Sequence, residues 1–365
     1  MKIGILTFHR AENFGAVLQC YALQEYLQKK YGHTTEVIDY RCKAIEKAYY
    51  VCNLRILVSR LNFIASINGY FKQLKFFRDK IRKKQQYRLF RKRYLHLSKP
   101  VCRPDRVTGY DVYITGSDQV WNPALTGGFD VAYFLSSQGM NVSRKISYAA
   151  STDSKGMLKL EKYHHALSQS LTHIDFISVR EKAFASFLSK FTAKEITVCC
   201  DPTFLLSKDD YLPLAVQPKE SNYVLVYHVA ESEEASHIAD MLAAKKGVKV
   251  VEAHASFDKR KDRQRHRQNL GPSEILGLIA YADSVVTTSF HGIALSLIME
   301  KQLFVISKKN NVRQNSLLQM LDLEDRIIKD GILHSLPSID YKKVKSKIEM
   351  MALSSKMYLN QSLTS

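Results

Sequence analysis

The sequence lacks long hydrophobic runs. No stretch of about eighteen apolar residues, the length that a transmembrane helix needs, occurs in the 365 residues. The segment MKIGILTFHR at the N-terminus turns polar after a few apolar positions and has no hydrophobic core of a signal peptide. We therefore expect a cytoplasmic protein, and any contact with a membrane would be at its inner face.

Cysteine is scarce as well. The six cysteines show neither the paired spacing of a metal site nor the density of a disulfide-rich secreted domain. Two of them, Cys199 and Cys200, are adjacent within an apolar segment. The sequence therefore predicts reduced, structural cysteines and no metal site.

Acidic residues are few relative to basic ones. The chain has 35 Asp and Glu against 54 Lys and Arg, which gives a formal net charge of +19. This imbalance favours an anionic partner: a nucleic acid, a membrane surface or a phosphorylated substrate. Because the sequence has no zinc-finger, RNP or helix-turn-helix signature, we expect no specific nucleic-acid binding, and a nonenzymatic nucleic-acid-binding protein is the most distant alternative.

The hydrophobic pattern indicates an α/β protein of two domains, each with alternating strands and helices. The first domain is expected at residues 1–206, with a helical insertion at about 43–99, and a linker follows at 207–221. The second domain is expected at 222–312. Residues 313–365 are predicted to form helices that return to pack on the first domain, with the last dozen residues frayed.

The predicted insertion is strongly basic. Residues 72–93 contain eleven Lys or Arg and a single acidic residue, Asp79, in a pattern typical of an amphipathic helix. Such a surface could dock onto anionic lipid or onto an acceptor carried on a lipid diphosphate. The alternative is a solvated face of a helical insertion.

A loop follows the first predicted strand at the edge where open α/β sheets bind ligands. It contains Asn13, Phe14 and Gly15, and Gly15 would let a ligand approach the backbone closely. The alternative is an ordinary turn between a strand and a helix.

A second polar loop follows the strand predicted at 111–115. Its residues Asp118, Gln119, Trp121 and Asn122 combine carboxylate and amide groups with the only tryptophan of the chain. This mixture is typical of a sugar-binding site. The alternative is a capped turn with Trp121 in the core.

Arg180 follows a further strand, predicted at 175–179, and precedes a helix. An arginine in this place could grip a carboxylate or a phosphate with two hydrogen bonds. The alternative is an ion pair with a nearby acidic residue.

The chain is organised around the segment from Asp283 to Ser307, which reads as strand, turn, buried helix and strand. Ser289 is a natural N-cap, so His291 and Gly292 fall in the first helical turn, where anions bind. A bound anion would favour the imidazolium, so substrate binding could charge His291 as a general acid. The alternative is a capped helix whose histidine only packs or bonds to the backbone.

Together these segments resemble the polysaccharide pyruvyl transferase family, from residue 1 to about residue 328. One position departs from the family pattern, since Thr288 stands where the family often has Asp. The similar motifs are NFGAVLQ at 13–19, GSDQVWN at 116–122, SYAAS at 147–151, SVRE at 178–181, DPT at 201–203, GP at 271–272 and SFHG at 289–292.

The resemblance implies two Rossmann-like domains that face each other across a cleft, as in GT-B glycosyltransferases. It also implies transfer of the pyruvyl group of phosphoenolpyruvate to hydroxyls of a saccharide, free or lipid-linked, which forms a cyclic ketal in cell-surface polysaccharide biosynthesis. Phosphoenolpyruvate is then a co-substrate, and no cofactor is expected. A nucleotide-sugar glycosyltransferase with the same architecture is the nearer alternative.

By similarity, Arg180 and His291 match positions associated with donor binding and catalysis. We expect His291 to be the general acid and Asp118 to accept the proton of the sugar hydroxyl. The donor site is predicted at Arg180, Ser289, Phe290, His291 and Gly292, and the acceptor site at Asn13, Phe14, Gly15, Asp118, Gln119, Trp121 and Asn122.

Overall fold

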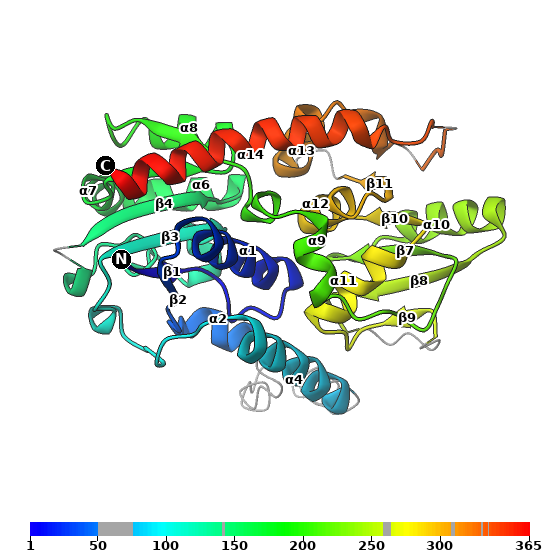
Figure 1. Cartoon of the computed structure of the whole chain (residues 1–365), viewed down its shortest axis with the longest axis horizontal. Coiled ribbons are helices and arrows are strands. Elements are labelled where there is room, and N and C mark those ends of the chain that lie inside the picture. Colours follow the sequence, from blue (N-terminus) through cyan, green and yellow to red (C-terminus); the bar gives the residue numbers. More distant parts are fainter. Residues whose placement is uncertain (50–75, 141–142, 258–263, 308–310, 330, 335) are drawn as a thin grey trace, which may run out of the picture.

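A computed structural model describes residues 1–49, 76–140, 143–257, 264–307, 311–329, 331–334 and 336–365. The first part of the basic segment, residues 72–75, lies outside these ranges. Within them the chain forms two six-stranded sheets, each flanked by helices (Figure 1). All strand pairs of both sheets are parallel, which fits their almost continuous apolar sequences.

The first sheet has the strand order β2-β1-β3-β4-β5-β6. Its strands are β1 (Lys2–Leu6), β2 (Thr34–Val37), β3 (Val112–Asp118), β4 (Arg144–Ala150), β5 (Phe176–Val179) and β6 (Ile196–Val198). The helices of this domain include α1 (Phe14–Tyr31), α5 (Pro123–Thr126), α6 (Ser154–Leu160), α7 (His164–Thr172) and α8 (Lys182–Leu188).

The second sheet has the order β12-β11-β10-β7-β8-β9. Its strands are β7 (Tyr223–His228), β8 (Lys249–His254), β9 (His266–Arg267), β10 (Ser284–Thr287), β11 (Gln302–Ile306) and β12 (Ile327–Ile328), and its helices are α10 (Glu233–Lys246), α11 (Pro272–Tyr281), α12 (Phe290–Ile298) and α13 (Val312–Met320). Because β12 pairs with β11, this domain continues past residue 312, where the sequence placed its end.

A cleft of about 1510 Å³ separates the two domains and is lined by residues of both. The loops after β1 and β3 contribute to one wall, and the loops after β7, β10 and β11 contribute to the other. The carboxyl ends of parallel strands therefore border the cleft on both sides. The predicted fold, two Rossmann-like domains facing across a cleft in a GT-B-like arrangement, is confirmed.

The insertion contains α2 (Lys43–Ala48) and α4 (Phe77–Tyr94). Helix α4 reaches the second domain, where the Asn269 amide donates to Asp79 over 2.9 Å. Two of its cations, Lys83 and Arg91, are buried rather than exposed. The basic residues of α4 therefore do not form a single solvated face.

The chain ends in a long helix, α14 (Tyr341–Thr364), which runs along both domains (Figure 1). The Tyr341 hydroxyl donates to a backbone carbonyl of the second domain, and the Tyr358 hydroxyl donates to the Ser147 carbonyl of the first over 2.8 Å. Leu359 and Leu363 are buried. The prediction of a frayed end was wrong, because these apolar side chains pack against the first domain.

The expected linker at 207–221 contains a helical turn, α9 (Lys208–Tyr211), followed by a 3-10 turn at Leu212–Leu214. Tyr211 and Leu214 are buried, so the segment packs against its surroundings. Among the described helices, none combines the length and the apolar character that crossing a bilayer would require.

Candidate active site

Helix α12 begins at the edge of the cleft, directly after β10. The Ser289 hydroxyl accepts a hydrogen bond from the Gly292 backbone amide over 3.2 Å and so caps the helix. This places His291 in the first helical turn, where its side chain is 9% exposed and lines the cleft with Ser289 and Phe290. The buried Gly292 does not line it.

The imidazole of His291 meets residues of the opposite domain. Its Nε2 lies 3.4 Å from Asp201 Oδ2, within ion-pair distance, but it makes no hydrogen bond to the described residues. The ring packs against Gly15 of α1, where a Cβ atom would overlap its Cγ and Nδ1. Gly15 therefore makes room for His291, because a side chain at position 15 would force the imidazole to move.

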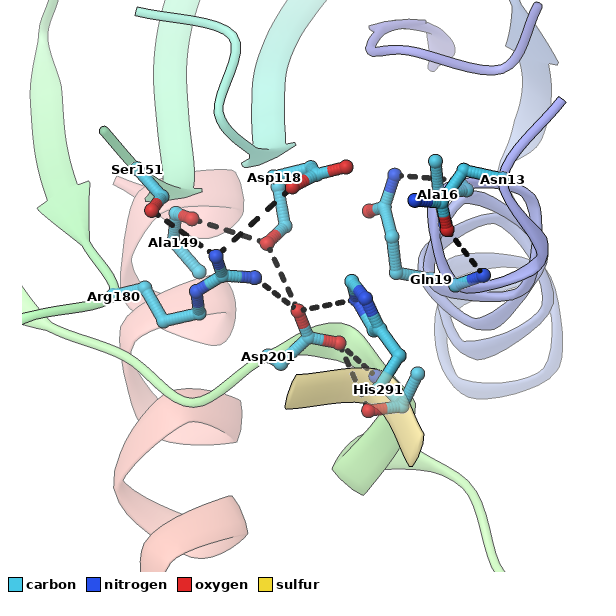
Figure 2. A network of polar contacts seen from close by, with 12 residues as sticks. Asn13, Ala16, Gln19, Asp118, Ala149, Ser151, Arg180, Asp201 and His291 are labelled. Carbon is cyan, nitrogen blue, oxygen red and sulfur yellow. Dashed lines mark hydrogen bonds and ion pairs between the residues drawn. The ribbon is translucent and has the colours of Figure 1, made fainter. Parts of the chain in front are cut away.

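Asp201 follows β6 and has a fully buried side chain. Its Oδ1 accepts hydrogen bonds from the backbone amide and the hydroxyl of Thr203, over 3.1 and 2.8 Å, while Oδ2 accepts one from Arg180 over 2.7 Å. Burial opposes the charged carboxylate, but His291 and Arg180 outweigh it and hold the pKa of Asp201 well below its usual range. Figure 2 shows Asp201 between the two basic side chains.

Arg180 is committed to protein partners. Besides Asp201, its guanidinium donates to Glu181 over 2.9 Å and to the Ser151 hydroxyl over 3.1 Å, and it lies 4.5 Å from the centre of the Phe290 ring. Burial lowers its pKa, but the attraction of Glu181, Asp201 and Asp118 is larger and raises it. Arg180 is buried and does not line the cleft, so the predicted direct grip on a donor anion is replaced by the alternative, an ion pair.

Asp118 ends β3 and lines the cleft together with Gln119. Its backbone has a φ of 68°, in the left-handed region that costs energy for a residue with a side chain. One carboxylate oxygen lies 4.0 Å from Arg180 Nη2 (Figure 2). The strained backbone thus places a carboxylate at the surface of the cleft, near the Arg180 network.

Two residues of the same loop serve the fold instead. Trp121 is completely buried, donates from Nε1 to the Tyr133 carbonyl over 2.8 Å and stacks on Phe134. Asn122 is buried as well and caps α5 by accepting from the Ala124 amide over 3.0 Å. The prediction that Trp121 and Asn122 contact an acceptor was wrong for this structure, and the core alternative holds.

In the loop after β1, one predicted acceptor residue also lines the cleft while the other two are buried. Asn13 lines the cleft, and its side chain caps α1 by accepting from the Gly15 and Ala16 amides over 3.0 and 3.4 Å. Phe14 is buried against Tyr227 of the second domain, with ring centres 4.7 Å apart. Phe14 and Gly15 therefore hold the domains together beneath the cleft rather than forming its surface.

Thr288 does not stand in for the missing family Asp. Its hydroxyl donates to the Ala230 carbonyl over 3.4 Å and accepts from the Val229 amide over 3.3 Å. The carboxylate beside His291 comes instead from Asp201 in the other domain. The DPT motif at 201–203 contains this residue, but the sequence alone assigned it no catalytic role.

Arg313 is the functional candidate that sequence reasoning missed. It lies in the first turn of α13, is half-buried and lines the cleft. Among the described residues it has no ion pair or hydrogen bond to a protein acid, and burial and the nearby Arg180 lower its pKa. A desolvated cation without an acidic partner in the described part of the chain is a candidate for binding an anion. Its one signal in the sequence is its place at the start of the helix that follows a strand, β11.

Among the described residues, no group of possible metal ligands gathers inside the cleft itself. Within the part of the chain that the structure describes, one group of His and acidic side chains has metal-ligand spacing: His228, Glu252 and His254, at the ends of β7 and β8.

Comparisons with known proteins give a family match and several similar structures. A family model described as polysaccharide pyruvyl transferase matches residues 13–310. No curated protein matches it in sequence. The chain is similar in structure to a UDP-GlcNAc 2-epimerase of Methanocaldococcus jannaschii in complex with UDP-GlcNAc and UDP, with 12% identity, 96% of this chain and 93% of that chain covered and a TM-score of 0.44.

Two other solved structures give similar values. A UDP-GlcNAc 2-epimerase of Neisseria meningitidis bound to UDP-GlcNAc has 10% identity, covers 100% of this chain and 99% of its own, and has a TM-score of 0.46. An E. coli heptosyltransferase with ADP has 11% identity, 96% and 100% coverage and a TM-score of 0.38.

Proposed function

The chain belongs to the polysaccharide pyruvyl transferase family, and we propose that it transfers pyruvyl from phosphoenolpyruvate to two hydroxyls of one saccharide in cell-surface polysaccharide biosynthesis. The products are a cyclic pyruvate ketal and inorganic phosphate. The observation that carries this proposal is the meeting of motifs far apart in the sequence: His291 packs on Gly15 and lies beside Asp201, at the cleft between the domains.

The donor has two anionic groups, a carboxylate and a phosphate. Arg313 offers a guanidinium with no partner among the described acids, and His291 offers an Nε2 with no hydrogen bond. Arginine suits both anions because its N–H groups form two parallel bonds. We therefore assign donor binding to Arg313 and His291, and give Arg180 a positioning role behind them.

His291 is the proposed general acid. Its Nε2 lies 3.4 Å from Asp201 Oδ2, so an imidazolium formed there has a buried carboxylate beside it. The imidazolium gives its proton to the methylene carbon of phosphoenolpyruvate, and the central carbon becomes electrophilic. Arg180 and Thr203 keep Asp201 in place for this step.

Two hydroxyls of the acceptor then complete the reaction. The first attacks the central carbon and loses its proton to Asp118, whose carboxylate lies at the cleft. Phosphate leaves, and the second hydroxyl adds to the same carbon as its proton goes to the departing phosphate. The cleft of about 1510 Å³ has room for donor and saccharide together, with Asn13 and Gln119 beside the acceptor.

A test compares two donors on the purified protein. Phosphoenolpyruvate and a panel of 4-nitrophenyl hexosides should yield inorganic phosphate and a glycoside that carries one pyruvate ketal, detected by mass spectrometry. Calorimetry should show binding of phosphoenolpyruvate even without an acceptor. Release of a nucleotide from UDP-sugars, with no binding of phosphoenolpyruvate, would favour the glycosyltransferase alternative and overturn the proposal.

We also propose that the acceptor is lipid-linked and that the basic segment at 72–93 brings the protein to the inner face of an anionic membrane. Exposed cations of α4, Arg88 and Lys92 among them, support this. Each basic residue near such a surface contributes about 1 kcal/mol. Arg88→Glu with Lys92→Glu should therefore weaken binding to phosphatidylserine vesicles, whereas the matched pair Arg103→Glu with Arg106→Glu should not. Equal binding by both pairs contradicts the proposal.

A further inference from the structure

Ligand-type atoms of four side chains lie near one another, at the carboxyl-terminal parts of β7 and β8 and the start of β9. His228 Nε2 lies 2.9 Å from Glu252 Oε2, and the same oxygen lies 3.7 Å from His254 Nε2 and 3.5 Å from His266 Nδ1. The two nitrogens of His254 and His266 are 3.2 Å apart. The side chains of His228, Glu252 and His254 are essentially inaccessible to solvent.

The four separations are near the spacing between ligands around one small cation, and the ligand atoms of His228, Glu252 and His254 all lie within 4.8 Å of one another. The rings of His228 and His254 are stacked, with centres 4.6 Å apart and planes 10° apart, so one ring has to turn before both face the same ion. A tetrahedral Zn²⁺ with ligands at about 2.0–2.1 Å keeps neighbouring ligand atoms about 3.3 Å apart. Most of the measured separations, between 3.2 and 3.7 Å, lie near this value, and the 2.9 Å pair is slightly closer. Three imidazoles and one carboxylate form a donor set that suits Zn²⁺ better than the oxygen-seeking Mg²⁺ or Ca²⁺.

Groups around the cluster hold the ligands in orientation. His254 Nδ1 is 2.8 Å from Glu231 Oε1, so that carboxylate favours the tautomer whose Nε2 lone pair points to the other ligands. This is the carboxylate-to-histidine arrangement that supports metal-bound imidazoles. Arg265 donates to Glu252 Oε1 over 2.8 Å and so leaves Oε2 on the side of the imidazoles, where the Ser236 hydroxyl also donates to it over 3.0 Å.

We propose that His228, Glu252, His254 and His266 bind one Zn²⁺ ion in a site beside the cleft. Four protein ligands make a closed site, so the ion has a structural rather than a catalytic task. Glu231 connects it to the cleft, since this residue contacts His254 and also lines the cleft wall. The ion therefore fixes the loop at Val229–Ser232. The expectation of no metal site rested on the cysteines, which take no part here.

The test measures metal directly, without turnover, and so does not depend on the proposed reaction. The full chain, with any affinity tag removed, is dialysed with Zn²⁺, then against metal-free buffer, and analysed by mass spectrometry for metals. We expect about one Zn²⁺ per chain. The metal-free protein should bind Co²⁺ with the strong visible absorption of a tetrahedral site.

Variants locate the ion. His266→Ala removes a partly exposed ligand and should leave the fold intact by circular dichroism, yet retain no stoichiometric Zn²⁺. Glu231→Gln, which removes only the supporting carboxylate, should weaken Zn²⁺ binding by about 10–100-fold. His237→Ala, an exposed histidine of α10, is the matched control and should retain the ion. Wild-type protein that takes up no Zn²⁺ or Co²⁺, or a folded His266→Ala that binds Zn²⁺ as tightly as wild type, overturns the proposal.

Discussion

The two walls of the cleft hold their cations in different ways. Behind the first wall, Arg180 is bound to Asp201, Glu181 and a serine hydroxyl, and its side chain is 4% exposed. On the second wall, Arg313 has no ion pair among the described residues, and the Nε2 of His291 lies 3.4 Å from Asp201 without a hydrogen bond. A guanidinium whose hydrogen bonds are already made positions its neighbours, whereas one without partners is available to a ligand. The Arg180 side is therefore mainly a scaffold, which also presents Asp118, and the second wall carries the groups assigned to the donor.

The comparison is tested most directly by removing the proposed acid of the second wall. His291→Gln keeps the size of the side chain but cannot act as an acid. We expect kcat/KM to fall by about 10²–10⁴-fold, measured as phosphate release. Thermal unfolding should stay close to wild type. Turnover at the wild-type rate would remove His291 from the mechanism.

The next largest effect should come from the scaffold wall. Arg180→Met leaves Asp201 and Glu181 buried without their cation, so the free energy of unfolding should drop by about 3–5 kcal/mol. Urea denaturation measures this free energy, and Arg103→Met, at an exposed arginine, is the control. A change below about 1 kcal/mol would contradict the scaffold role.

Arg313 should behave in the opposite way to Arg180. Arg313→Ala removes a charged hydrogen-bond donor worth about 1.5–3 kcal/mol, so the affinity for phosphoenolpyruvate should fall by roughly 10–100-fold. Calorimetry measures this loss, and stability should change by no more than about 0.5 kcal/mol. Arg313→Lys should restore part of the affinity. Unchanged binding in the alanine variant would show that Arg313 is not the donor site.

The smallest effect concerns the contact that joins the walls. Gly15→Ala places a methyl group on the imidazole of His291 and should cost about 1–3 kcal/mol of stability through overpacking. The same change in a His291→Ala background should be neutral or stabilising, because alanine favours the helix by up to about 1 kcal/mol. A double-mutant cycle from urea denaturation gives the coupling. Additive effects would mean that Gly15 and His291 do not touch.

The fold was accessible from the sequence because parallel strands buried on both faces leave apolar runs that alternate with amphipathic helices. The end of the second domain was missed since β12 has two residues, too short for any pattern. The end of the chain was misjudged because Leu359 and Leu363 stand among polar residues that carry no strong signal.

The site was accessible only in part. Ser289 caps the helix as its residue type suggests, and this places His291 at the cleft. In contrast, the partners of Arg180 lie on different loops, and no local pattern can show that Asp201, 21 residues away, satisfies it. Trp121 was misread because a buried and a ligand-facing aromatic ring look alike in a sequence.

Helix α14 bears on how the chain responds to cleavage. It anchors to the second domain through Tyr341 and to the first through Tyr358, so the domains are tied twice, by this helix and by the segment before β7. A protease that cuts once between residues 207 and 221 would leave two fragments that still copurify. Two separately expressed halves should likewise associate only when α14 is present on one of them.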